Sequence, residues 1–254
     1  APKIMTQETI EEVVVTPAAS QPQESNQDET AVFPLGHRGL DAMLYGGLPK
    51  GSNILITGSL GTGKSSLSRQ CLSTALNNNE KALFIAIDDD PQRIRESIDQ
   101  EAVTVYEDNQ QLRFIDAYSW SSLSPPENER FAVTGSLELN QLSGLIADAS
   151  YELGQTPQEK AGGIRIIDSI SSLLINFELS AVQRFLNQIA RTAVAFGGVT
   201  TLFIIEEGTI DETILNNIKY IMDGVIELKA DQDARLGRVA SMKWARFQPN
   251  WIEV

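Results

Sequence analysis

The sequence predicts an α/β domain with a mainly parallel sheet flanked by helices. Short runs of aliphatic residues alternate along the chain with longer segments in which apolar residues recur at helical spacing. A glycine-rich loop separates the first of these runs from the first helical segment. Alternation of strand and helix is typical of parallel sheets, because each crossover helix returns the chain to the same edge. After residue 205 the alternation ends, and the sequence predicts a closing β-hairpin.

The individual elements follow from local composition. Strands are expected where aliphatic and β-branched residues cluster, at residues 52–57, 82–87, 112–115, 164–167 and 199–205. Helices are expected from apolar spacing or an opening proline, at residues 64–76, 91–100, 137–153 and 181–196. The hairpin is expected from residues 224–228 and 239–244, with Asp231, Asp233 and Gly237 between its strands. Residues 116–130, rich in Ser, Pro and Glu, are predicted to form an exposed loop.

One domain is expected over residues 32–254, preceded by a tail. Residues 1–31 are dominated by Gln, Glu, Ser, Thr and Pro and carry six acidic residues against one lysine. This composition predicts a disordered acidic and polar segment. Within it, residues 10–15 could instead dock on a partner as a short strand. The rest of the chain shows no internal repeat, which favours a single domain.

Composition limits the possible partners and location. The 254 residues, 42% of them hydrophobic, suffice for a substantial core. The formal net charge of −14 argues against a nucleic-acid partner, because phosphate neutralisation requires a basic surface. The single cysteine, Cys71, excludes an intramolecular disulfide framework, favours a cytoplasmic location and is expected to pack in the first helix. No apolar run of membrane-spanning length and no signal-peptide pattern is present, so no membrane insertion is expected.

The glycine-rich loop reads GSLGTGKSS, residues 58–66, and matches the pattern G-x-x-x-x-G-K-[ST] between a strand and a helix. Its glycines let backbone N–H groups surround a phosphate, and the following helix presents its positive end to the same anion. The loop therefore predicts a nucleotide site, with a flexible Gly/Ser turn as the alternative. The expected nucleotide contacts are Gly58, Ser59, Leu60, Gly61, Thr62, Gly63, Lys64, Ser65 and Ser66.

Three polar side chains are expected to act on the phosphates and their metal ion. Lys64 should reach the β- and γ-phosphates as a catalytic cation, and the Ser65 hydroxyl should bind Mg²⁺. Asp168 ends the strand in GGIRIIDSISS, at the carboxyl edge of the predicted sheet, where it can hold Mg²⁺ through water. A strand ending in Asp-Ser can also be an ordinary turn onset. ATP and Mg²⁺ are the expected cofactors.

Three aspartates end the second strand in IAIDDDPQRI. Asp88 and Asp89 are candidate catalytic residues that could orient or deprotonate the attacking water. Crowded acids at a strand end can instead cap a helix, and Asp90, which precedes Pro91, is assigned that role.

Four other residues have weaker signals. Glu206 and Glu207 end a strand at the same edge, where they could sense the γ-phosphate or form a solvated strand end. His37, the only histidine, is expected to be a local packing or hydrogen-bonding residue. Arg165 interrupts an aliphatic strand, so a surface or a charge partner is expected beside it.

The segment FPLGHRGLDAMLYGGLPKGSNILITGSLGTGKSS resembles the opening of the KaiC-like branch of RecA-type P-loop ATPases. The similarity continues through FIAIDDDPQRI, RIIDSISSLL, VTTLFIIEE and IMDGVIELKADQDARLGRVASMKWAR, and covers nearly all of residues 33–246. The resemblance implies a single-domain KaiC homologue with a RecA-like core that binds ATP with Mg²⁺. It also implies assembly into a ring or a filament with nucleotide between subunits. A hexameric ring is expected, in which Lys243 and Arg246 act across the subunit interface.

The chain departs from the family pattern at three places. The family usually has a Glu-Glu pair where this chain has Asp88 and Asp89, so the candidate base is one methylene shorter. The family usually has Lys-x-Arg-Gly with a nearby histidine, whereas here Arg246 is displaced by one position and no histidine follows. Lys219 and Tyr220 stand where the family's clock proteins carry an autophosphorylated Ser-Thr pair, so a clock oscillator is not expected.

Three functions are compatible with these features. The preferred hypothesis is a regulatory ATPase with slow hydrolysis, coupled to ring assembly or to an unknown protein partner. A second is a nucleotide-gated scaffold that scarcely hydrolyses ATP, resembling the archaellum motor's KaiC-like accessory protein FlaH. A third, a DNA recombinase similar to RadA, is disfavoured by the net charge and by the lack of a basic extension. The first two hypotheses differ in whether Asp88 and Asp89 can activate water for hydrolysis.

Overall fold

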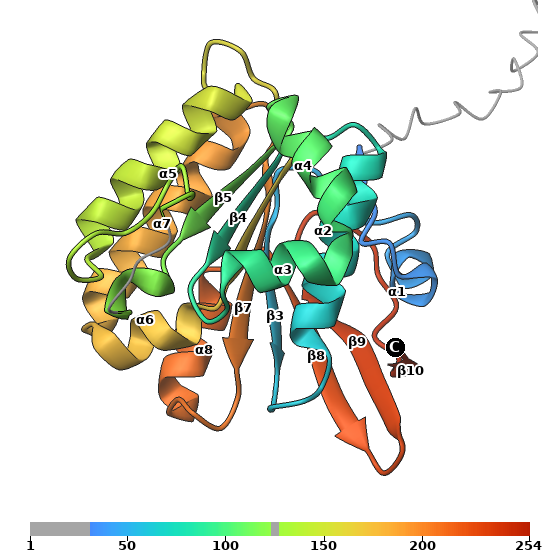
Figure 1. Cartoon of the computed structure of the whole chain (residues 1–254). Helices are drawn as coiled ribbons and strands as arrows, with labels where there is room; N and C mark the ends of the chain where they lie inside the picture. Colours follow the sequence, from blue (N-terminus) through green and yellow to red (C-terminus); the bar gives the residue numbers. More distant parts are fainter. Residues whose placement is uncertain (1–30, 123–126) are drawn as a thin grey trace, which may run out of the picture.

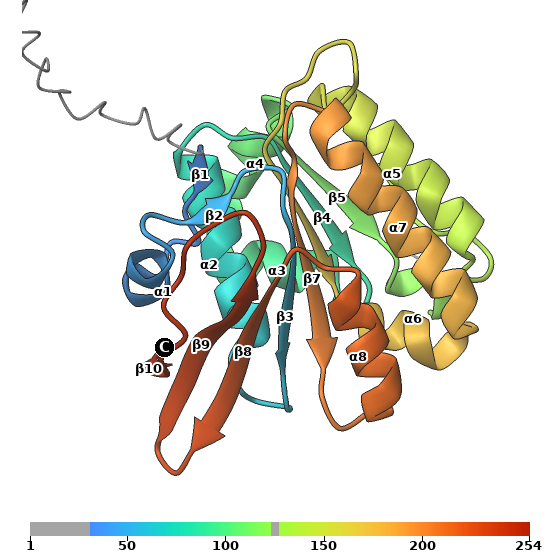
Figure 2. The same cartoon turned by 180° about the vertical axis from the view of Figure 1, so that it is seen from behind.

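A mainly parallel β-sheet runs through the centre of the molecule, and helices cover both of its faces (Figures 1 and 2). The structure is a computed structural model that describes residues 31–122 and 127–254. The predicted α/β class and the closing hairpin are confirmed. The predicted disordered tail falls outside the described residues, apart from Ala31.

Six strands of the main sheet run parallel within the described ranges. They are β3 (Asn53–Gly58), β4 (Ala82–Ala86), β5 (Leu112–Asp116), β6 (Ile164–Asp168), β7 (Thr200–Glu206) and β8 (Gly224–Asp231). The antiparallel strands β9 (Ala234–Met242) and β10 (Ile252–Glu253) extend one side. The order across the sheet is β10-β9-β8-β3-β7-β6-β4-β5. A separate antiparallel ribbon pairs β1 (Val32–Phe33) with β2 (Leu48–Pro49).

The helices form two layers, one on each face of the sheet (Figure 1). The first layer contains α1 (Arg38–Met43), α2 (Lys64–Asn77), α3 (Pro91–Ile98) and α4 (Gln100–Asp108). The second contains α5 (Leu139–Leu153), α6 (Ile170–Asn176), α7 (Leu179–Ala195) and α8 (Glu212–Tyr220). No helix in residues 31–122 or 127–254 has the length and apolarity needed to cross a bilayer.

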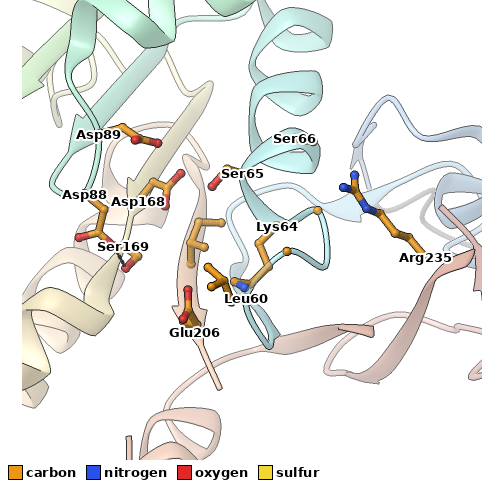
Figure 3. Close-up of a pocket in the computed structure, with 13 residues that line it drawn as sticks. Leu60, Lys64, Ser65, Ser66, Asp88, Asp89, Asp168, Ser169, Glu206 and Arg235 are labelled. Atoms are coloured by element: carbon orange, nitrogen blue, oxygen red, sulfur yellow. Dashed lines mark hydrogen bonds between the residues drawn. The ribbon is translucent and has the colours of Figure 1, made fainter. Parts of the chain in front are cut away.

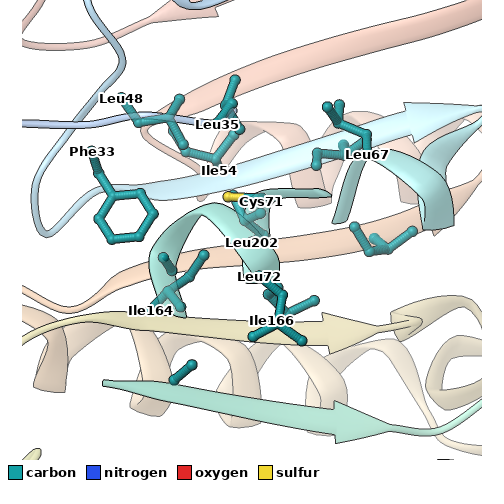
Figure 4. Packing of buried hydrophobic residues seen from close by; sticks show 14 of the residues in the cluster. Phe33, Leu35, Leu48, Ile54, Leu67, Cys71, Leu72, Ile164, Ile166 and Leu202 are labelled. Carbon is teal, nitrogen blue, oxygen red and sulfur yellow. The ribbon is translucent and has the colours of Figure 1, made fainter. Parts of the chain in front are cut away.

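Helix α2 packs its apolar side against the centre of the sheet. Leu67, Cys71 and Leu72 face the strands β3, β6 and β7, where Ile54 and Ile166 are among the buried contacts (Figure 4). Cys71 is fully buried in this layer, as the sequence predicts. Burial raises the pKa of the Cys71 thiol, so the thiol stays protonated and behaves as a small apolar group.

Five helices differ clearly from the sequence prediction. The helix expected at residues 91–100 ends at Ile98, because Asp99 adopts extended backbone and its carboxylate accepts N–H groups of Glu101 and Ala102 at the start of α4. The short helices α1, α4, α6 and α8 were not predicted. Two or three turns of helix supply too few apolar repeats to reveal the period.

The hairpin turn is tighter than predicted. β8 continues through Asp231, and β9 begins at Ala234, so the turn consists of Gln232 and Asp233. Gly237 pairs with Leu228 inside the ladder rather than lying in the turn. The outer half of this ribbon is largely exposed, so its polar residues give no hydrophobic strand signal.

The prediction for Arg165 is wrong. Arg165 in β6 is 1% exposed, and among the described residues no carboxylate forms an ion pair with it. Its side chain lies on the α5 and α7 face of the sheet, where it hydrogen-bonds Ser150 and Thr192. The sequence pattern could not reveal this, because both partners are distant in the chain and uncharged.

Leu72→Ala tests the packing of α2 on the sheet. Leu72 is 0% exposed, so the substitution should lower the free energy of unfolding by about 2–5 kcal/mol through lost burial and a residual cavity. Urea unfolding of the variant and wild type measures this difference. Val105→Ala, at a 55% exposed position of α4, is the control and should stay within about 0.5 kcal/mol. Equal losses in both variants would contradict the assignment of α2 to the core.

Candidate functional site

The glycine-rich loop connects the end of β3 to the start of α2. A Cβ atom at Gly58 would lie 2.5 Å from the carbonyl oxygen of Leu228, so the chain can pass this point only as glycine. Gly63 is the N-cap of α2 with φ of +95°, a left-handed conformation that also favours glycine. Because Gly63 offers no capping side chain, the first N–H groups of α2 face the loop interior and can bind an anion.

Lys64 extends into this loop. Its Nζ donates a hydrogen bond to the carbonyl oxygen of Ser59 at 2.7 Å. Burial lowers the pKa of Lys64, while the nearby carboxylates of Glu206 and Asp168 act in the opposite direction. The ammonium group is therefore held at the position where the loop would enclose a phosphate.

The loop borders a cavity of about 290 Å³ (Figure 3). Of the nine residues predicted to contact the nucleotide, six line this cavity: Leu60, Gly61, Gly63, Lys64, Ser65 and Ser66. The other three, Gly58, Ser59 and Thr62, do not line it. They shape the loop instead, because the carbonyl oxygen of Ser59 accepts hydrogen bonds from both Lys64 and the Thr62 hydroxyl.

Asp168 and Ser65 meet at the base of the cavity. Both side chains line the cavity, and Figure 3 shows them facing one another from β6 and α2. Asp168 is 6% exposed, and burial raises its pKa to about 6, with the charges of Asp88 and Asp89 adding to this effect. The structure thus brings together the two residues predicted to hold the metal ion.

The oxygen donors here fit Mg²⁺, which prefers carboxylate and hydroxyl ligands completed by water and phosphate. Within the described ranges, no group of three or more His, Cys, Asp or Glu side chains is arranged to hold a metal ion. A cation beside Ser65 and Asp168 would therefore depend on phosphate oxygens for much of its coordination.

Both candidate catalytic aspartates lie on the wall beside Asp168, and both have partners. Asp88 accepts hydrogen bonds from the hydroxyls of Ser169 and Ser172, at the start of α6. Asp89 forms an ion pair with Arg69 of α2 at 3.0 Å. These contacts hold the two carboxylates at the end of β4, at the cavity wall.

The assignment of Asp90 as a cap is confirmed. Its carboxylate accepts the N–H of Gln92 at 2.9 Å, and Pro91 occupies the first turn of α3. His37 has the predicted local role, since it caps α1 and its Nδ1 accepts the N–H of Leu40 at 3.2 Å.

The two glutamates at the end of β7 differ in placement. Glu206 lines the cavity, and its N–H donates to the Ser171 hydroxyl at 2.8 Å. Glu207 does not line the cavity and accepts a hydrogen bond from the Thr57 hydroxyl at 2.8 Å. Of the two, Glu206 is therefore the one placed to respond to a bound phosphate.

Arg235 was not predicted as a site residue. This residue of β9 lines the cavity, and its side chain passes along the outer side of the loop (Figure 3). A Cβ atom built on Gly63 would be 3.6 Å from Arg235 Cδ, which shows how closely the two segments approach. Arg235 belongs to no recognisable sequence motif. Its place beside the cavity depends on how β8 pairs with β9, and the sequence alone did not predict that register.

Lys243 and Arg246 lie at the opposite edge of the sheet. Met242, the last residue of β9, pairs with Gly224, which itself pairs with Ile54 near the start of β3. Lys243, which was predicted to lie on the second hairpin strand (residues 239–244), follows the end of β9 at Met242, and Arg246 lies beyond it. They are exposed and do not line the cavity of their own chain, so they cannot contact a nucleotide bound there.

Comparisons with known proteins agree with this architecture. Residues 33–249 match the family model described as KaiC ATPase. A UPF0273 protein of Pyrobaculum aerophilum is 28% identical over 205 residues, covering 79% of this chain and 69% of that protein. A UPF0273 protein of Sulfurisphaera tokodaii is 27% identical over 198 residues, covering 76% and 67%.

A solved structure has the same fold. The KaiC-like protein of Pyrococcus horikoshii superimposes with a TM-score of 0.68 at 19% sequence identity, covering 88% of this chain and 94% of that one. The family match extends from β1 to the segment beyond β9 and includes the loop, the aspartates and the hairpin. This chain therefore belongs to the KaiC ATPase family.

Proposed function

We propose that this chain is a regulatory ATPase that binds Mg-ATP, hydrolyses it slowly and couples the nucleotide to ring assembly or to a protein partner. The observation that carries the proposal is that Ser65 and Asp168 face one another in the cavity beside the glycine-rich loop. With Lys64 inside the same loop, the site has a cation for the phosphates and two oxygen ligands for a metal ion.

Different groups of the chain would bind the phosphates and the metal ion. The N–H groups at the start of α2 and the ammonium of Lys64 receive the phosphates. Ser65 would bind Mg²⁺ directly and Asp168 through water, and the ion would neutralise charge on the transferred phosphoryl group. Arg235 adds a positive charge on the outer side of the loop.

The surroundings of Asp88 and Asp89 support slow hydrolysis. A general base must come within hydrogen-bond reach of the attacking water. Asp88 is occupied by two serine hydroxyls and Asp89 by Arg69, and each carboxylate is one methylene shorter than the glutamate usual in the family. A misplacement of about 1 Å can cost on the order of a hundredfold in rate.

The second candidate function is a scaffold that binds ATP without hydrolysing it. The same engaged aspartates favour it, since neither carboxylate is free to accept a proton from water without losing a present partner. A recombinase remains disfavoured by the net charge of −14.

The placement of Lys243 and Arg246 supports assembly. Because they lie at the sheet edge remote from their own loop, any contact with a nucleotide must be made in a neighbouring subunit. A contact that joins two different faces of the same chain generates a ring when its rotation closes. A hexameric ring is the form we propose.

Asp168→Asn tests the metal role through pH. Asp168 must be ionised to hold the cation, and its pKa of about 6 means that the wild type gains Mg²⁺-dependent ATP affinity, by up to about tenfold, between pH 5 and pH 7. The variant should lack this gain. Calorimetric titration of both proteins measures it, and their comparison cancels the titration of ATP itself. Parallel pH profiles in the two proteins would contradict the assignment.

In the unliganded protein, the contribution of Asp168 to folding stability falls as pH rises, whereas its contribution to ATP affinity increases. The folded-state pKa of Asp168 lies above its ordinary value of 3.8, so the folded state holds this proton more tightly. The Asp168 contribution to stability is full below about pH 4 and is lost as pH rises to about 6. Denaturant unfolding should show this loss in the wild type and not in Asp168→Asn.

Asp89→Glu tests hydrolysis. The longer side chain restores the reach of the carboxylate, so phosphate release should rise about tenfold or more with little change in ATP affinity. Asp88→Glu is the neighbouring control. A steady-state phosphate assay beside calorimetry separates rate from binding. The proposal fails if the wild type already turns over at about 1–100 per second, or if Asp88→Ala/Asp89→Ala leaves its rate unchanged.

Arg246→Ala tests assembly. Light scattering after size-exclusion chromatography should show a larger species for the wild type with Mg-ATP than without it. The variant should assemble less while its monomer binds ATP with unchanged affinity. Arg184→Ala, at an exposed position of α7, is the matched control and should assemble like the wild type. A strictly monomeric wild type at saturating Mg-ATP would refute ring formation.

A further inference from the structure

A second cavity lies between α5 and α7, on the face of the sheet opposite α2. Its volume is about 80 Å³, and Arg165 of β6 forms part of its lining. The remaining walls are mostly apolar and include Ile146, Ile189 and Phe196. This cavity shares no lining residue with the one beside the phosphate loop.

Arg165 is a buried cation without a counter-ion in the described part of the chain. Its Nη1 donates to the Thr192 hydroxyl at 3.1 Å and its Nη2 to the Ser150 hydroxyl at 3.3 Å. The guanidinium carbon lies 5.1 Å from the centre of the Phe196 ring. Its Nε is buried and has no hydrogen-bond partner. The side chain thus carries a full charge that two neutral hydroxyls and one ring only partly compensate.

Neither acidic residue of helix α5 forms an ion pair with Arg165, since Asp148 is exposed and Glu152 pairs elsewhere. Glu152 accepts hydrogen bonds from Arg113 and Arg130. Burial lowers the pKa of Arg165 to about 10, which still leaves the guanidinium charged at neutral pH. A buried charge without an opposite charge is costly, and an aliphatic residue of similar size would avoid this cost. The arginine therefore destabilises the apo fold unless an anion completes its environment.

The geometry of the group selects the class of anion. Arginine has five N–H donors in a planar fork, and two of them are used here. Each Nη keeps one further N–H, and a carboxylate can accept from both Nη atoms together, in a bidentate arrangement that guanidinium groups favour. The apolar walls suit a short hydrocarbon chain attached to that carboxylate.

The volume limits the size of this ligand. A cavity of about 80 Å³ corresponds to roughly two or three water molecules. Pockets for larger organic ligands usually measure about 300 Å³ or more. We propose that this cavity binds a small monocarboxylate of two to four carbons, with its carboxylate on Arg165 and its carbon chain against Ile146 and Ile189. This proposal is independent of nucleotide binding and of hydrolysis.

Thermal unfolding of the full chain with sodium propionate tests the proposal. Propionate at about 10–50 mM should raise the unfolding midpoint by a few degrees, because a ligand that binds only the folded state stabilises it by mass action. Sodium chloride at equal ionic strength and neutral propionamide are the controls and should give no such increase. An equal effect of propionate and propionamide, or no effect of propionate, would overturn the proposal.

Three variants test whether the stabilisation by propionate arises from binding in this cavity. Arg165→Met should abolish the response to propionate, while Arg191→Met, at an exposed position of α7, should retain it. Ala147→Trp places a large ring at the exposed rim of the cavity and leaves Arg165 intact, so it should also abolish the response. If Arg165→Met fails to fold, the tryptophan variant decides the question. A full response in Ala147→Trp would overturn the proposal.

Discussion

The packing of α2 against the central strands is the interaction on which the candidate site depends. This helix buries Leu67, Cys71 and Leu72 against β3, β6 and β7, and its first residues are Lys64 and Ser65. The burial of its side chains therefore fixes the height and rotation of the phosphate loop relative to the end of β6. Asp168 lies beside Ser65 because the hydrophobic contacts of Leu67, Cys71 and Leu72 hold α2 against the sheet.

A metal ion that entered with the nucleotide would also change the charge around the loop. Among the described residues that line the cavity, four are acidic, Asp88, Asp89, Asp168 and Glu206, and two are basic, Lys64 and Arg235. A polyphosphate that entered alone would meet a wall of the same sign, and like charges repel strongly in a partly buried site. A divalent cation would neutralise this excess of two negative charges. Nucleotide and metal are thus expected to bind as one unit.

The parts of the fold and site that the sequence predicts are those fixed by local geometry. The loop is recognisable because Gly58 and Gly63 are required by close backbone contact and by a left-handed conformation, and both lie within one short motif. Asp168 is recognisable because a buried strand ends there. Arg235 and the burial of Arg165 were not predictable in this way. Each depends on residues distant in the chain, namely the loop at Gly63 and the hydroxyls on α5 and α7.

The single cysteine provides a natural chemical probe of how α2 moves. Cys71 belongs to α2, the helix that begins with Lys64 and Ser65, and is fully buried. Its thiol stays in the unreactive protonated form. A thiol reagent can reach it only when α2 separates from the sheet. The rate of modification therefore reports how often α2 separates from the sheet, and no cysteine has to be introduced to measure it.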